Sequence, residues 1–226
     1  MKNNQFIKAV IFDMDGVIIN SEPLWQIAEK NIFSKLGIPV SEKEIKESSA
    51  LTVIELCEMF YKKYPWGDKD FKKIEEQIVN EVIQLIKTND TEIPGVKNIL
   101  KFIRKRDYKL ALASNSSHDL IEVVLKKVGV KEYFDFIVSA SNLPKGKPDP
   151  SIYIYTAKNL GIAPERCLVV EDSIVGILAA KNAGMSVIAI PRNEDFNKKD
   201  FDLADLKISS LNLLPHILKI FKIKTN

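Results

Sequence analysis

Two acidic residues follow a short apolar segment near the start of the chain. Residues 9–12 are Ala-Val-Ile-Phe, and Asp13 and Asp15 come directly after them, ahead of a glycine. A short apolar run that ends in turn residues is typical of a buried strand. Buried carboxylates are very costly without a compensating cation or a shared proton. The pair therefore indicates a metal-assisted active site, although a simple strand-ending turn explains these two residues taken alone.

Polar residues also follow three later strand-like segments. They are Ser114 after 109–113, Lys147 in the loop after 134–140, and Glu171 with Asp172 after 166–170. The carboxyl ends of parallel strands meet at one edge of a sheet, so we expect these side chains to come together. Carboxylates with few nitrogen or sulfur donors suit a hard cation such as Mg²⁺, and a lysine, a hydroxyl and a helix N-terminus can hold phosphate oxygens. The combination predicts phosphoryl transfer with attack by a carboxylate on phosphorus.

Each of these residues also has a purely structural interpretation. Ser114 could begin a helix cap, and Glu171 could be a charge stabilised by a helix N-terminus. Lys147 could be a solvated loop lysine, with Lys145 as a rival for its role. The occurrence of all four features at four strand ends, in this order, favours the catalytic interpretation.

From residue 94 onward, strand-like and helical segments alternate. The predicted strands after the first are 109–113, 134–140, 166–170, 185–190 and a short last one at 207–209. Repeated strand–helix units favour a mostly parallel sheet with helices on both faces, which is the α/β class. In the helix that follows Ser114, the spacing of Ser116 and Asp119 predicts a capping box, and Gly129 predicts the end of the helix.

The segment between the first two predicted strands is far longer than a crossover connection requires. Its apolar residues have helical spacing in three stretches, which are centred near residues 28, 59 and 78. We expect residues 20–90 to form a helical domain inserted into a discontinuous core of residues 1–19 and 91–226. Because the insertion begins beside Asp13 and Asp15, it could act as a lid that excludes water and reads the substrate; the alternative is a helical elaboration without a catalytic part.

Composition and charge exclude several classes of protein. The 226 residues are 46% hydrophobic and 28% charged, with a formal net charge of +3. This balance gives no indication of nucleic acid as a partner. The two cysteines do not form a disulfide framework, no apolar run is long enough to span a membrane, and the N-terminus does not resemble a signal peptide. We expect a cytoplasmic protein.

The four motifs together resemble those of the haloacid dehalogenase-like (HAD) superfamily. Asp13-Met-Asp15 matches its first motif, Ser114 the second, Lys147 the third, and Glu171-Asp172 the fourth. The resemblance covers nearly the whole chain. It implies a Rossmannoid parallel sheet core with an inserted helical cap of the C1 type.

The resemblance also implies roles for the motif residues. Asp13 is expected to be the nucleophile that forms an aspartyl-phosphate, and Asp15 to protonate the leaving alcohol and then activate water. Ser114, the adjacent Asn115 and Lys147 are expected to bind the phosphoryl group. The family's Mg²⁺ would be held by Asp13, the backbone carbonyl of Asp15, and Asp172, with Glu171 either a ligand or a support behind the ligands.

Several stretches resemble the β-phosphoglucomutase-like branch of the superfamily, and in particular bacterial 2-deoxyglucose-6-phosphate (hexitol-phosphate) phosphatases. They are Ser21–Trp25, Tyr64–Trp66, Glu171–Ser173 and Leu203–Leu211. The prediction is thus a Mg²⁺-dependent phosphatase of small sugar or polyol phosphates, and this cap type implies a monomer.

Two other functions stay open. One is a phosphosugar mutase of the β-phosphoglucomutase type, and the other is a non-catalytic phospho-acceptor or regulatory protein. A mutase must hold a second phosphate, for which an arginine is suited, and the expected substrate-reading segment Glu47–Val53 has none. Lys62 or Lys63 could substitute for that arginine. Asp15 argues against a pure acceptor, which needs no acid or base.

Overall fold

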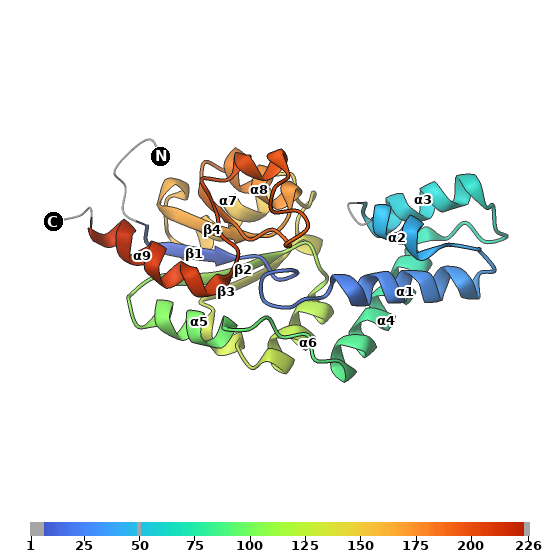
Figure 1. Cartoon of the computed structure of the whole chain (residues 1–226), viewed down its shortest axis with the longest axis horizontal. Coiled ribbons are helices and arrows are strands. Elements are labelled where there is room, and N and C mark those ends of the chain that lie inside the picture. Colours follow the sequence, from blue (N-terminus) through green and yellow to red (C-terminus); the bar gives the residue numbers. More distant parts are fainter. Residues whose placement is uncertain (1–6, 49–50, 224–226) are drawn as a thin grey trace. The chain divides into compact units, whose positions relative to one another are not determined.

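The computed structural model describes residues 7–48 and 51–223 (Figure 1). The chain divides into two compact units. The α/β unit comprises Met1–Asn20 and Glu92–Asn226, and the helical unit comprises Ser21–Thr91. The α/β unit is therefore assembled from two separate segments of the chain.

A parallel sheet forms the centre of the α/β unit. Its six strands within the described residues have the order β3-β2-β1-β4-β5-β6. They are β1 (Ala9–Phe12), β2 (Lys109–Ser114), β3 (Phe136–Ser139), β4 (Cys167–Glu171), β5 (Ser186–Ala189) and β6 (Leu206–Lys207). In the central pairings, Phe12 lies beside Leu112 of β2 and Val170 of β4. The parallel α/β fold predicted from the sequence is confirmed, and this register brings the ends of β1, β2 and β4 to one level.

Helices cover both faces of the sheet. In the view of Figure 1, α7 and α8 lie on one face, and α5, α6 and α9 lie on the other. Ala9 and Ile11 of β1 belong to the buried cluster on the α7 and α8 side, so Val10 and Phe12 point to the opposite face. These helices are α5 (Val96–Arg104), α6 (His118–Val128), α7 (Ser151–Leu160), α8 (Ile174–Asn182) and α9 (Leu214–Ile223).

The start of α6 differs from the sequence prediction. Ser117, and not Ser116, is the residue that caps the helix, and its side chain accepts a hydrogen bond from the Leu120 N–H. The Ser116 hydroxyl donates instead to the carboxylate of Asp15. The Ser116 side chain is thus engaged with Asp15, and the cap lies one residue later, at Ser117.

Helix α9 has no counterpart among the elements predicted from the sequence. Leu214 and Leu218, one helical turn apart, are buried, and α9 packs beside α5. This segment therefore completes the core on one face of the sheet.

The helical unit consists of α1 (Glu22–Lys35), α2 (Glu42–Glu47), α3 (Val53–Lys63) and α4 (Phe71–Thr88). Capping boxes begin α2 and α3, where Ser41 and Thr52 each exchange hydrogen bonds with a glutamate three residues later. Phe33 and Phe60 pack with ring centroids 4.9 Å apart, and Trp66 lies against Phe33. The unit thus has an apolar core of its own.

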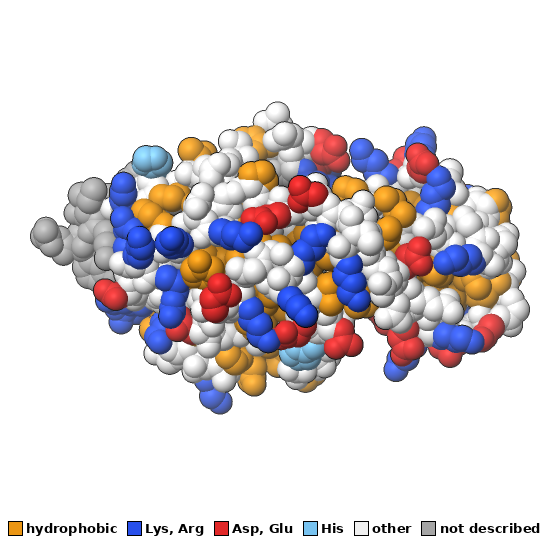
Figure 2. Space-filling model, turned by 90° about the horizontal axis from the view of Figure 1, so that it is seen from below, with side chains coloured by type: hydrophobic (Ala, Val, Ile, Leu, Met, Phe, Trp, Pro, Cys, Tyr) orange, Lys and Arg blue, Asp and Glu red, His pale blue; other side chains and the backbone are white. Residues whose placement is uncertain are grey.

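The described helices include none that is both long enough and apolar enough to cross a bilayer. Figure 2 shows one face of the molecule, on which Asp and Glu side chains are scattered among Lys and Arg side chains. Basic side chains on this face therefore lie among acidic ones, which matches the balanced composition.

Aspartates fix the register at both ends of the sheet. The N–H of Asp135 donates to the Leu110 carbonyl, and its Oδ2 accepts from the Leu110 N–H at 2.8 Å. Asp205 makes the same pair of bonds with Val187. A basic side chain pairs with each carboxylate, Arg104 in the first case and Lys181 in the second. Each aspartate lies just before an edge strand, β3 or β6. Its backbone N–H and its carboxylate bond to one residue of the neighbouring strand and so extend the strand pairing by one position.

We expect Asp135→Asn to lower the free energy of unfolding by about 1–2 kcal/mol at neutral pH, because the ion pairs with Arg104 and Lys109 are lost. Burial alone would raise the pKa of Asp135, but the Leu110 N–H and Arg104 hold it below its ordinary value of 3.8. A carboxyl with a depressed pKa stabilises the fold above its unfolded pKa and stops doing so as the pH falls through the folded pKa.

Urea unfolding of wild type and variant should therefore differ at pH 7 and converge as the pH falls below about 4. The exposed Asp200→Asn is the control and should change little at either pH. An equal difference between wild type and Asp135→Asn at both pH values would contradict this account.

Candidate active site

A lysine ammonium lies between two carboxylates at the carboxyl end of β1. Nζ of Lys147 donates to Asp13 Oδ1 at 2.5 Å, to Glu171 Oε1 at 2.7 Å and to the Ala113 carbonyl at 2.9 Å. The side chain is only 3% exposed. Lys145, the rival considered for this role, is exposed. The structure therefore places Lys147, from the loop after β3, at the ends of β1, β2 and β4.

Asp13 is the first residue after β1 and is buried. Burial raises the pKa of Asp13 to about 8; Lys147 opposes this shift, whereas Glu171 and Asp15 add to it. The ammonium of Lys147 therefore lowers the pKa of Asp13 without offsetting the effect of burial.

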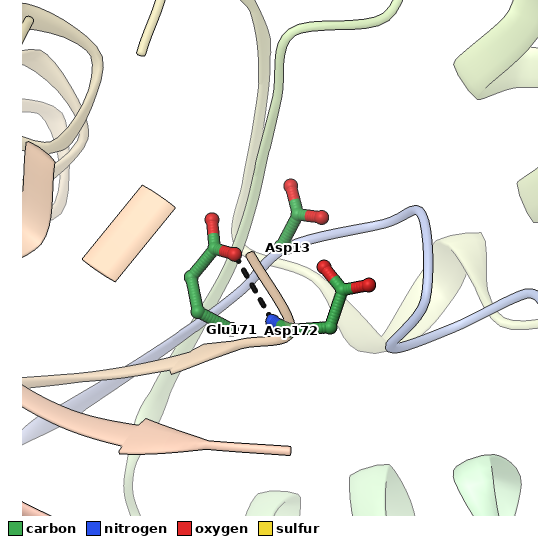
Figure 3. Close-up of side chains that lie close together, drawn as sticks. All are labelled: Asp13, Glu171 and Asp172. Atoms are coloured by element: carbon green, nitrogen blue, oxygen red, sulfur yellow. Dashed lines mark hydrogen bonds between the residues drawn. The ribbon is translucent and has the colours of Figure 1, made fainter. Parts of the chain in front are cut away.

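Asp13, Glu171 and Asp172 form a group of three carboxylates (Figure 3). One oxygen of each lies within 4.8 Å of the others. Burial also raises the pKa of Asp172 well above its usual range, with further contributions from the neighbouring carboxylates. The pairing of β1 and β4 brings Asp13 and Glu171 together, because Phe12 pairs with Val170 and these two residues come next in their chains.

Gly16 gives Asp172 the space that it occupies. A Cβ atom on Gly16 would lie 1.8 Å from Asp172 Oδ2, and Gly16 has a φ of +71°. Both the backbone conformation and the close approach of the carboxylate therefore require glycine.

Glu171 is fully buried and has donors around both of its oxygens. Oε2 accepts from the N–H groups of Asp172 and Ser173 and from the Ser173 hydroxyl. Oε1 accepts from Lys147 and from the hydroxyl of Tyr153 at 2.8 Å. A Cβ on Gly176 would lie 1.7 Å from Oε1, so α8 approaches this carboxylate closely.

Tyr153 of α7 is a site residue that the sequence analysis did not identify. Its side chain is fully buried, its hydroxyl bonds to Glu171, and its ring centroid lies 5.1 Å from Lys147 Nζ. In the sequence it is one more apolar position of an amphipathic helix. The sequence offers one general indication: a tyrosine at a buried helix position usually needs a hydrogen-bond partner for its hydroxyl.

Asp15 faces the loop that follows β2 and is not one of the three carboxylates grouped within 4.8 Å, although it is close enough to raise the pKa of Asp13 and Asp172. Its Oδ2 accepts from the Ser116 hydroxyl at 2.7 Å, and the Ser114 hydroxyl lies at 3.5 Å. Ser114 Oγ in turn accepts from the Ser116 N–H at 3.0 Å. Ser116 is thus a second site residue that the sequence analysis placed elsewhere, as a helix cap.

Asn115 points its side chain toward the Lys147 loop. Its Oδ1 accepts from the Lys147 N–H at 2.9 Å, and its Nδ2 donates to the Lys147 carbonyl at 3.3 Å. All seven site residues predicted from the sequence therefore lie in one neighbourhood at the carboxyl edge of the sheet.

The donor set of this site fits a divalent cation. The carboxyl groups of Asp13, Asp15, Glu171 and Asp172 lie near the Lys147 ammonium, and burial and the crowding of like charges together raise the pKa values of Asp13 and Asp172. Oxygen donors without cysteine or histidine suit a hard cation. The described residues thus include an acidic group able to hold a metal ion.

Comparisons with known proteins agree with this geometry. Residues 10–190 match the family described as haloacid dehalogenase-like hydrolase. The chain is 34% identical over 215 residues to hexitol phosphatase B of Escherichia coli, covering 95% of this chain and 97% of that one. It is 33% identical over 185 residues to a phosphorylated carbohydrates phosphatase of Thermotoga maritima, covering 80% and 84% of the two chains.

Among solved structures, a β-phosphoglucomutase from Clostridium difficile superposes with a TM-score of 0.81 at 26% identity, covering 97% of this chain and 99% of that one. The chain therefore belongs to the haloacid dehalogenase-like hydrolases and is similar to the β-phosphoglucomutase-like proteins among them. Within this family it is an enzyme of the phosphatase class.

We expect Gly16→Ala to reduce phosphatase activity at least 100-fold, because the new methyl group displaces the Asp172 carboxylate. Gly161→Ala is the matched control, with a φ of +67° and no atom within 4 Å of its Cβ. It should cost only the strain of the left-handed backbone, about 1–2 kcal/mol, and leave activity unchanged. Circular dichroism checks that both variants fold; near-wild-type activity in Gly16→Ala would contradict the argument.

We expect Tyr153→Phe to lower the free energy of unfolding by about 1.5–3 kcal/mol, because a buried charged acceptor loses a donor. The measurement is urea unfolding without divalent cations. Tyr155→Phe on the same helix is the control, since Tyr155 is 41% exposed. Equal stability of Tyr153→Phe and wild type would show that the hydroxyl contributes nothing to Glu171.

Proposed function

We propose that this protein is a Mg²⁺-dependent phosphatase that hydrolyses monophosphate esters of small sugars or polyols through an aspartyl-phosphate. The observation that carries the proposal is the group of Asp13, Glu171 and Asp172, within 4.8 Å of one another, with Lys147 beside it. The sugar or polyol class is supported by the names of the two phosphatase relatives.

The metal site proposed here consists of Asp13, Asp172 and the backbone carbonyl of Asp15, with Glu171 as a ligand or as the support behind them. Glu171 also accepts a hydrogen bond from Lys147, so it positions that lysine whether or not it binds the metal directly. When bound, Mg²⁺ would neutralise charge on the phosphoryl oxygens and favour the ionised form of Asp13.

In the first step, a carboxylate oxygen of Asp13 attacks phosphorus, and the bond from phosphorus to the ester oxygen breaks. Asp15 donates its proton to the departing alcohol. In the second step, Asp15 takes a proton from water as that water attacks phosphorus. The bond between phosphorus and Asp13 then breaks, and inorganic phosphate leaves.

Lys147 and Ser114 are proposed to hold the phosphoryl group during both steps. The buried ammonium is a compact positive charge beside the attacking carboxylate. The Ser116 hydroxyl, which bonds to Asp15 at 2.7 Å, is in a position to fix the orientation of the acid.

The helical unit is proposed to be the cap domain of this family. The chain leaves the α/β unit at Asn20, close after Asp15, and returns at Glu92. Ile19 and Glu92 form a β-bridge, so the two connections start side by side at the site's edge of the sheet. We propose that the helical unit reads the alcohol part of the substrate and excludes water.

The charge of the helical unit supports a phosphatase in preference to a mutase. Residues 21–91 contain no arginine, ten lysines and thirteen aspartates and glutamates. Lys63, a candidate for the second-phosphate role, is paired with Glu44. Residues 49 and 50 of the expected substrate-reading segment lie outside the described residues. A net acidic unit without arginine suits an uncharged polyol better than a second phosphate.

We expect purified protein to release phosphate from hexitol phosphates and 2-deoxyglucose 6-phosphate with Mg²⁺, and to lose this activity with EDTA. A panel of about thirty phosphate esters, assayed with and without the metal, is the measurement. Asp13→Asn is the control, since an amide is not a competent nucleophile and should abolish turnover with the fold intact.

The outcomes separate the candidate functions. Conversion of β-glucose 1-phosphate to glucose 6-phosphate, faster than phosphate release, would replace the proposal with a mutase. A phosphorylated protein that persists for hours would indicate a phospho-acceptor. Normal turnover by Asp13→Asn would refute the covalent mechanism.

A further inference from the structure

The side-chain amide of Asn115 and the backbone of Lys147 form a closed pair of hydrogen bonds. Oδ1 accepts from the Lys147 N–H at 2.9 Å, and Nδ2 donates to the Lys147 carbonyl at 3.3 Å. The side-chain amide thus bonds to both the N–H and the carbonyl of Lys147, as the backbone of a neighbouring strand does. It joins the loop after β2 to the loop after β3, neither of which has ladder hydrogen bonds at this point.

Gly146 makes room for this pair. A Cβ atom on Gly146 would lie 2.8 Å from Asn115 Oδ1 and 3.2 Å from its Cγ and Nδ2. Asparagine is flexible and could turn away from a methyl group, but it would then lose the bond to the Lys147 N–H. Any side chain at position 146 therefore competes with the pair of hydrogen bonds, although the backbone there does not require glycine.

Lys147 is in consequence fixed at both ends. Its Nζ is held by Asp13, Glu171 and the Ala113 carbonyl. Its backbone is held by Asn115, only two residues after Ala113 in the chain. Residues 113–115 at the end of β2 thus hold both the backbone of Lys147 and its ammonium.

We propose that the Asn115 side chain is a positioning residue for Lys147, and that Gly146 is the partner that permits it. This inference rests on the proposed function for the role of Lys147 itself. The sequence analysis expected Asn115 to bind the phosphoryl group; this inference assigns its side-chain amide to Lys147 instead, because both ends of the amide bond to that residue. Asn115 then affects the reaction through the lysine, and its loss should lower kcat more than it raises KM.

The test compares Asn115→Ala, Gly146→Ala and the double variant. Asn159→Ala is the control for the first, because Asn159 also donates from its side chain to a backbone carbonyl but lies exposed on α7. Gly67→Ala is the control for the second, because its Cβ meets nothing within 4 Å. Each variant is assayed for kcat and KM on the best ester of the panel, and for its urea midpoint.

We expect Asn115→Ala and Gly146→Ala each to lower kcat about tenfold with KM within about threefold, and the double variant to equal either one. Gly146→Ala should lower the urea midpoint when it is introduced into the wild type. It should leave the midpoint unchanged when it is introduced into Asn115→Ala, because the pair of hydrogen bonds is already lost there. Both control variants should match wild type.

Additive effects in the double variant would overturn the proposal, as would a rise in KM with unchanged kcat in Asn115→Ala, which indicates a direct substrate contact. The stability comparison requires no catalytic activity. If wild type releases no phosphate from any ester, the proposed function fails, whereas coupling between positions 115 and 146 in the urea midpoints would still show that the pair exists.

Discussion

The site depends on the ammonium of Lys147, which is almost completely buried and lies 2.5 Å from Asp13 and 2.7 Å from Glu171. It joins the loop after β3 to the ends of β1 and β4, and it compensates part of a charge that the fold otherwise could not bury. Removal of one partner from a buried ion pair typically costs about 3–5 kcal/mol, because the other charge is left uncompensated. The same atoms therefore stabilise the fold and carry the proposed chemistry.

Much of the fold and the positions of the motif residues could be predicted from the sequence, because the relevant information is local. The segment Ala9–Phe12 was predicted with its observed bounds, and β2, β4 and β5 differ by one residue at their ends. The polar residues that follow the apolar runs could be predicted to lie close together, because parallel strands in register have their carboxyl ends at one edge of the sheet.

The features that could not be predicted depend on contacts between distant segments. The local spacing of Ser116 and Asp119 favours Ser116 as the cap, whereas in the structure the Ser116 hydroxyl bonds to Asp15, far away in the chain, and Ser117 caps the helix. Tyr153 looks like any apolar position of its helix until Glu171 is placed beside it. The role of Gly146 likewise follows from the approach of Asn115 and not from its own backbone.

The discontinuous α/β unit has a consequence for the order in which the chain can fold. β1 is an interior strand of the sheet, yet it is synthesised before the other five described strands, and its neighbours begin only at Lys109 and Cys167. The helical unit is a single continuous segment with its own apolar core, so it can form while β1 still has no partner. Such non-local pairing is slow and leaves an apolar strand open to misassembly. The period of greatest risk during synthesis therefore lasts until β4 has emerged.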